Sequence, residues 1–101
     1  MKEYTITERL VPVYSTWELR GSHTRVQRAR ASREGPKAGA MGTVIRRLDK
    51  RTVLVKFDEP IKGAGGEYFV YGEDNSTNRL WACRIDTLNR VDTNNLTEVT
   101  P

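Results

Sequence analysis

The sequence predicts an all-β fold: a small five-stranded antiparallel barrel with an N-terminal arm and a short helical turn. Within residues 42–58, two Val-rich apolar runs flank a short charged turn, which is the pattern of a β-hairpin. A chain of 101 residues supports one hydrophobic core. Its 37% hydrophobic and 30% charged residues are ordinary for a small antiparallel sheet with one solvated face. One domain is therefore expected.

Residues 1–24 are predicted to form the arm. The segment from Tyr4 to Val13 mixes β-branched and charged residues, but Pro12 cannot donate to a central ladder, so an edge strand or extended arm is expected. Ser15 as N-cap with Glu18 three residues later forms the pattern of a capping box, which predicts one or two helical turns.

Residues 25–92 are predicted to form the barrel. The alternation that begins at Arg25 indicates a strand, and the Gly- and Pro-rich segment 33–42 indicates a loop too long for a tight hairpin. The hairpin at 42–58 follows. Leu54 breaks the alternation of its second strand, which favours strands covered on both faces, as in a curled barrel.

The remaining elements are two further strands, a turn and a tail. Strands are expected at 67–71 and 79–85, because aromatic and apolar residues gather there between turn-forming segments. A 3₁₀ turn at 86–88 should lead into a last short strand. Residues 93–101 are polar and rich in Thr and Asn, so a flexible C-terminal tail is expected.

The hairpin also carries a resemblance to a known class of module. The run Met41-Gly42-Thr43-Val44-Ile45, followed by Thr52-Val53-Leu54-Val55-Lys56-Phe57-Asp58, resembles KOW and Tudor-type modules of the Src-homology-3-like small barrels, over residues 25–92. The resemblance implies work on nucleic acid or with RNA polymerase. A Tudor-type aromatic cage would draw on Tyr68, Tyr71 and Trp81.

The charge of the chain is concentrated in one region. The net charge is +4 and the isoelectric point is near 9.5. Residues 20–56 hold eleven Lys or Arg against two acids, a net +9, whereas the rest holds six against eleven, a net −5. Clustered cations attract phosphates and release their counterions, so this imbalance favours a polyanion-binding surface.

The predicted binding residues are the cations of this region. They are expected to bind nucleic-acid phosphates or an acidic partner; the alternative is a solvated face that discourages edge pairing. They are Arg25, Arg28, Arg30, Arg33, Lys37, Arg46, Arg47, Lys50 and Arg51. Trp17 lies outside the predicted barrel, where it either covers the open end or anchors a partner, whereas Trp81 is expected in the core.

Catalytic, metal and cofactor sites are not predicted. His23 lacks further ligands at metal-binding spacing, and the single Cys83 sits in a predicted strand, where a buried thiol is the ordinary finding. The glycines of segment 63–66 do not precede a Lys-Ser or Lys-Thr pair, so they form no phosphate loop. No cofactor is expected. The sequence also shows no signal peptide and no membrane-spanning stretch, so a cytoplasmic protein is expected.

The sequence leaves three hypotheses for function. The first is a non-catalytic module that binds DNA or RNA through phosphates, with little sequence specificity. The second is a protein-interaction module or small regulator that docks on an acidic protein, such as a subunit of the transcription or translation machinery. The third, by fold analogy with plasmid-type dihydrofolate reductases, is a catalytic pore formed by symmetric assembly. The oligomeric state is left open.

Overall fold

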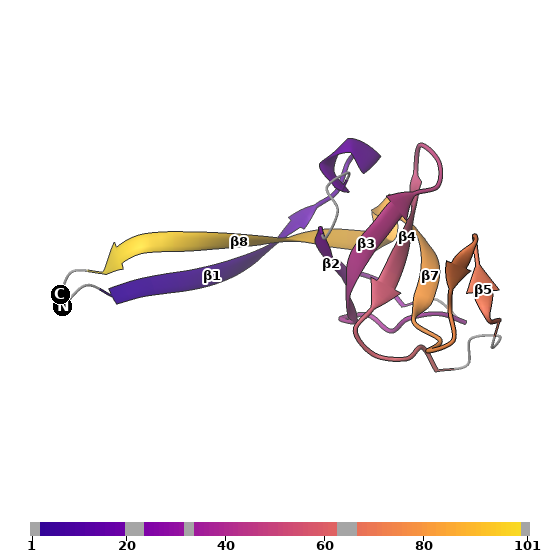
Figure 1. The fold of residues 1–101 in the computed structure, drawn as a ribbon. Helices are drawn as coiled ribbons and strands as arrows, with labels where there is room; N and C mark the ends of the chain where they lie inside the picture. The colour runs from indigo at the N-terminus through magenta and orange to yellow at the C-terminus, as the bar shows by residue number, and fades with distance from the viewer. Residues whose placement is uncertain (1–2, 20–23, 32–33, 63–66, 100–101) are drawn as a thin grey trace.

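The protein is all-β, as predicted. The computed structural model describes residues 3–19, 24–31, 34–62 and 67–99. A six-stranded antiparallel sheet has the order β1-β8-β2-β3-β4-β7, and a separate two-stranded sheet pairs β5 with β6 (Figure 1). The elements are β1 Glu3–Pro12, η1 Thr16–Leu19, β2 Arg25–Arg28, β3 Met41–Arg47, β4 Thr52–Phe57, β5 Phe69–Val70, β6 Glu73–Asp74, β7 Leu80–Arg84, η2 Ile85–Thr87 and β8 Leu88–Val99.

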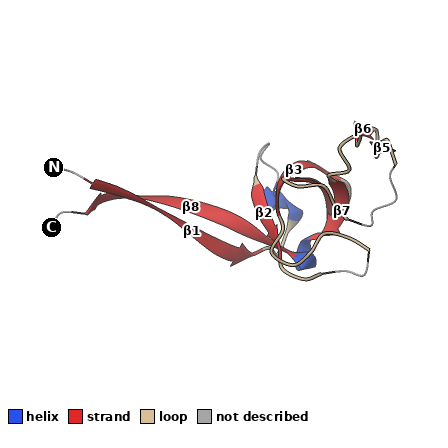
Figure 2. Cartoon of the chain, turned by 90° about the horizontal axis from the view of Figure 1, so that it is seen from below, coloured by secondary structure: helices blue, strands red, loops and turns tan. Residues whose placement is uncertain are grey.

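The predicted closed barrel of five strands is not what the structure shows. The main sheet curls around its core (Figure 2), but β1 and β7 are its two edges and no pairing between described strands joins them. One reason for the open sheet is the local conformation of the chain between β5 and β6. The chain reverses at Tyr71 and Gly72, which have φ of 49° and 80°, so β5 pairs with β6 as a small hairpin instead of joining the main sheet.

Strands β1 and β8 form a long two-stranded ribbon that projects from the curled sheet (Figure 1). Their pairing runs from Glu3 opposite Val99 to Pro12 opposite Asn89, and both termini lie at the far end. A flexible tail is expected from the sequence at 93–101, whereas in the structure β8 continues to Val99. The polar residues of this segment still carry backbone donors and acceptors, and β1 supplies their partners.

The core lies inside the curl of the sheet. It gathers side chains from almost every element of the body: Val13, Leu19, Val26, Val44, Val53, Val55, Phe57, Ile61, Cys83, Ile85 and Leu88. Leu54 is fully buried but outside this cluster, so three consecutive residues of β4 are buried. The pairing shifts at the bulge between Val44 and Arg46, opposite this stretch. The prediction that both faces of these strands are covered is confirmed for β4.

The short helix η1 begins where the capping pattern predicts. The backbone N–H of Glu18 donates to the carbonyl of Ser15 at 3.1 Å, and the Glu18 carboxylate accepts from the backbone N–H of Ser15 at 3.3 Å. Leu19 at the end of η1 is buried in the core, so the turn packs onto the sheet. No helix among the described residues is long and apolar enough to cross a membrane.

Candidate nucleic-acid interface

A shallow groove brings together cations from distant parts of the chain. Its cavity of about 300 Å³ lies where the segment before η1, the β3–β4 turn and the start of η2 meet. Val13 and Ile85 are buried in the core beneath it. The other residues that line it are Tyr14, Ser15, Lys50, Arg51, Arg84 and Asp86. We call these eight residues the basic groove.

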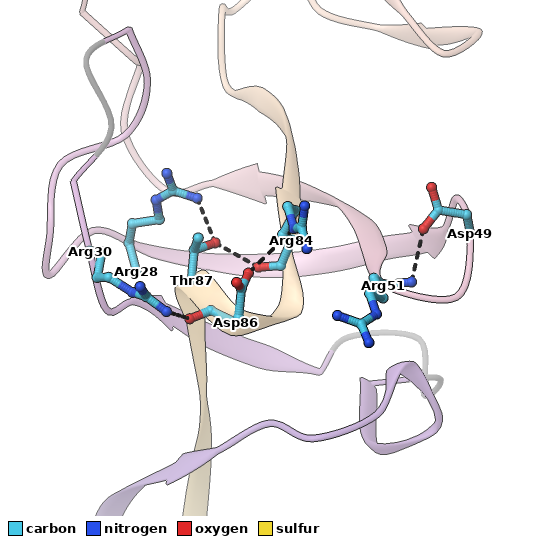
Figure 3. Close-up of polar contacts among 7 residues, drawn as sticks. All are labelled: Arg28, Arg30, Asp49, Arg51, Arg84, Asp86 and Thr87. Atoms are coloured by element: carbon cyan, nitrogen blue, oxygen red, sulfur yellow. Dashed lines mark hydrogen bonds and ion pairs between the residues drawn. The ribbon is translucent and has the colours of Figure 1, made fainter.

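The β3–β4 turn presents two of its cations. The Asp49 carboxylate accepts from the backbone N–H of Arg51 at 2.8 Å (Figure 3), which closes an Asx turn. The same N–H, with the Thr52 hydroxyl, holds the pKa of Asp49 below its ordinary value. The Arg51 carbonyl in turn accepts from the backbone N–H of Ile85 at 2.8 Å. The turn is therefore fixed to η2, and Lys50 and Arg51 project from a defined backbone.

Tyr14, in the segment before η1, also lines the groove and is 82% exposed. Its backbone N–H donates to the Glu18 carboxylate at 2.8 Å, so the capping residue of η1 also fixes the segment that carries the ring. An exposed aromatic ring beside cations can stack on a base, because every base offers a π face.

Arg84 and Arg30 extend the cationic surface along η2. Arg84 Nε lies 3.6 Å from the carboxylate of Asp86. Arg30, from the segment after β2, donates to the Asp86 carbonyl at 2.6 Å (Figure 3). The Arg84 carbonyl accepts from the Thr87 hydroxyl at 2.6 Å, which fixes the start of η2. Arg84 and Tyr14 are not among the binding residues that the sequence predicts.

The groove keeps a positive balance. Its lining side chains contribute three cations against one carboxylate, that of Asp86, and the carboxylates of Asp49 and Glu18 lie next to the lining. The structure records no ion pair between Lys50 or Arg51 and any other described residue, whereas Arg84 shares Asp86. A phosphate that entered the groove would therefore meet two cations that form no ion pair within the described part of the chain.

Two of the predicted binding residues have structural contacts instead. Arg25 donates from both Nη atoms to the Asp58 carboxylate, at 2.7 and 2.5 Å, and also to the Thr43 hydroxyl at 3.0 Å. This ion pair lowers the pKa of Asp58. Arg28 is only 4% exposed and donates to the Thr87 hydroxyl at 2.8 Å (Figure 3). Its burial removes Arg28 from the accessible surface.

The other predicted residues are dispersed. Arg46 donates to the carbonyl of Tyr71 and lies 3.8 Å from the Glu73 carboxylate, so it serves the β5–β6 hairpin. Arg47 is exposed at the end of β3, and Lys37 is exposed in the segment before β3. Arg33 lies outside the described residues, as does His23. For Trp17 the structure describes only the backbone, within η1. Of the predicted residues, the groove thus contains only Lys50 and Arg51, and Arg30 contacts the carbonyl of Asp86, which lines the groove from η2.

A larger cavity is less suited to an anion. It has a volume of about 500 Å³ and lies between residues 35–41 and residues 58–62. Its charged lining consists of two lysines, Lys37 and Lys62, and two acids, Asp58 and Glu59, and the rest is mostly Gly, Ala and Pro. Because these charges balance, the cavity offers no net attraction to phosphate, and the smaller groove is the better candidate.

Cys83 lies in the core, and its thiol has a raised pKa. Burial raises this pKa to about 11, against an opposing effect of the neighbouring Arg28. At pH 8, about one thiol in a thousand would be ionised in the folded protein, compared with roughly a quarter for an ordinary cysteine. We therefore expect that, at about pH 8, Ellman's reagent modifies Cys83 at least a hundredfold more slowly in the native protein than in the urea-unfolded protein. Equal rates would contradict the buried placement.

The candidate metal and aromatic sites do not come together. Among the described residues, no group of three or more His, Cys, Asp and Glu side chains is placed to hold a metal ion. Tyr68 and Tyr71 are exposed, but Trp81 packs against the core, so the three residues suggested for an aromatic cage do not share an exposed surface. No protein-family model, curated protein or solved structure matches this chain.

Proposed function

We propose that the protein is a non-catalytic module that binds single-stranded DNA or RNA in the basic groove. One observation supports the proposal most strongly: the exposed Tyr14 lines the same groove as Lys50 and Arg51, together with the buried apolar residues Val13 and Ile85. Proteins that bind single strands without sequence preference combine this pair of features, cations for the backbone and an aromatic ring for a base.

The roles of the groove residues follow from their chemistry. Lys50 and Arg51 bind consecutive phosphates, while Arg84, whose partner Asp86 lies at 3.6 Å, binds a phosphate more weakly. Tyr14 stacks on a base and gives no sequence preference, because stacking accepts any base. The groove is short, so a few nucleotides fill it.

Fluorescence anisotropy with defined probes tests this function. We expect a labelled single strand of about 12 nucleotides to bind. Its affinity should fall as the salt concentration rises and should depend only weakly on the base sequence. A duplex of equal length should bind more weakly, because its bases are already stacked on one another. A Glu-rich peptide is the probe for the alternative, an acidic protein partner.

The outcomes separate the two kinds of partner. Tighter binding of the strand than of the Glu-rich peptide, at equal charge, supports nucleic acid as the ligand. The reverse order would instead support docking on an acidic protein through the same cations. Absence of strand binding even at low ionic strength would refute the proposal.

A further inference from the structure

A second exposed surface lies on the β5–β6 hairpin. Tyr68, Phe69 and Tyr71 are 75%, 70% and 58% exposed, which places three large aromatic rings in solvent within four consecutive positions. The hairpin stands outside the main sheet (Figures 1 and 2). Large aromatic side chains gathered in solvent on one small hairpin are typical of interaction sites. The proposed nucleic-acid function does not use these rings.

The hairpin is held in place from both of its ends. At its base, the buried Asn75 donates from Nδ2 to the Glu67 carbonyl and accepts at Oδ1 from the Leu80 backbone N–H, both at 2.9 Å. At its tip, Arg46 from β3 binds the Tyr71 carbonyl and the Glu73 carboxylate. The rings are therefore presented on an anchored backbone, which lowers the entropy cost of binding a partner.

The backbone of the tip is unfavourable for its residue type. Tyr71 has a φ of 49°, in the left-handed region, where a bulky side chain is uncommon. Asn or Gly would fit the first position of such a turn with less strain. A strained backbone position that carries an exposed ring points to a function for that ring.

The charge near the rings indicates what kind of partner fits. Residues 67–77 contain three acids, Glu67, Glu73 and Asp74, and no Lys or Arg. Arg46 partly neutralises Glu73, and Lys56 of β4 lies near Asp74, so the three acids face two cations and Glu67 is the acid left without a nearby cation among the described residues. The backbone N–H of Ser76 donates to the Asp74 carboxylate at 2.8 Å. This negative field would repel the phosphates of a nucleic acid and attract a cation.

From these observations we infer that the β5–β6 hairpin docks an arginine-rich protein segment. Guanidinium groups stack on the faces of Tyr68, Phe69 and Tyr71, and their charge is matched chiefly by Glu67. Arginine is preferred over lysine, because a planar guanidinium both stacks on a ring and pairs with a carboxylate. The protein would then join nucleic acid and a cationic protein through two separate surfaces.

The test measures binding of a labelled Arg-Gly repeat peptide, with Lys-Gly and Glu-Gly repeats of equal length for comparison. We expect the Arg-Gly peptide to bind tightest and the Glu-Gly peptide not at all. The double variant Tyr68→Ala, Phe69→Ala should weaken Arg-Gly binding about tenfold while leaving strand binding unchanged. Tyr14→Ala is the matched control: it removes an exposed ring from the basic groove and should leave peptide binding unchanged.

Further measurements keep the inference open to refutation. If the double variant loses its folded circular dichroism spectrum, Glu67→Lys replaces it, since Asn75 contacts the backbone carbonyl of Glu67 and the substitution leaves that carbonyl in place. Equal affinity for the Arg-Gly and Lys-Gly peptides, or an unchanged affinity in both hairpin variants, would overturn the inference. So would a concentration-dependent increase in mass in analytical ultracentrifugation that Tyr68→Ala, Phe69→Ala abolishes, because the occupant would then be a second copy of the chain.

Discussion

Reversal of two charges, in the double variant Lys50→Glu, Arg51→Glu, is expected to weaken binding of a single strand about a hundredfold at roughly 50 mM salt. Each phosphate contact to a single strand contributes about 0.7 to the slope of log affinity against log salt. At that salt concentration one phosphate contact raises the affinity by a factor of about eight, so the loss of two contacts lowers it by a factor of about sixty. The new carboxylates add repulsion.

A matched variant separates the groove from the total charge of the chain. Lys56→Glu, Lys62→Glu makes the same change in net charge at two exposed lysines that do not line the groove. We expect it to reduce affinity by less than about tenfold, through the long-range field alone. Both variants should keep their unfolding midpoints, because all four side chains are exposed. Equal losses from the two variants would show that the groove is not the binding site.

Replacing Gly42 by Ala is expected to lower the free energy of unfolding by about 3 kcal/mol. Gly42 is buried in β3, opposite Phe57 of β4. A Cβ at this position would lie 2.7 Å from Val55 Cγ1, 2.9 Å from the Lys56 carbonyl oxygen and 3.2 Å from Phe57 Cα. Two of these atoms belong to the backbone of β4, so relief requires the two strands to move apart.

Gly39→Ala is the control for this prediction. Gly39 has a φ of 89° but nothing within 4 Å of an added Cβ, so its substitution costs about 1 kcal/mol through backbone strain alone. Urea unfolding, followed by tryptophan fluorescence, measures both variants. A Gly42→Ala variant that is no less stable than Gly39→Ala would show that β3 and β4 are not as close as the structure has them.

Local patterns in the sequence were sufficient for much of the body. The alternation around Val44 and Val53 predicts the β3–β4 hairpin, and the pair Ser15 and Glu18 predicts the start of η1; each depends on residues close together in the chain. The pairing of β1 with β8 could not be predicted in this way. It joins residues more than seventy positions apart, and its Thr- and Asn-rich strand lacks an apolar alternation.

The candidate site was predicted only in part, for the same reason. Clustering of charge along the sequence selected Lys50 and Arg51, which line the groove, but it also selected Arg28, whose guanidinium is buried beside Thr87. Arg84 and Tyr14 lie outside the basic segment of the sequence. They reach the groove because the curl of the sheet brings η2 and the segment before η1 to the β3–β4 turn. Composition indicates the sign of the charge on a surface, whereas tertiary packing decides which residues lie together on that surface.

Photo-crosslinking of a single strand that contains 5-iodouracil tests the central claim most directly, because this base forms covalent bonds with aromatic rings on which it stacks. The chain offers exposed rings on two separate surfaces, Tyr14 in the basic groove and Tyr68, Phe69 and Tyr71 on the β5–β6 hairpin. Mass spectrometry of the digested adduct locates the bond. We predict an adduct on Tyr14 that Lys50→Glu, Arg51→Glu abolishes. An adduct on the hairpin, with none on Tyr14, would contradict both the proposed site and the division of the molecule into two binding surfaces.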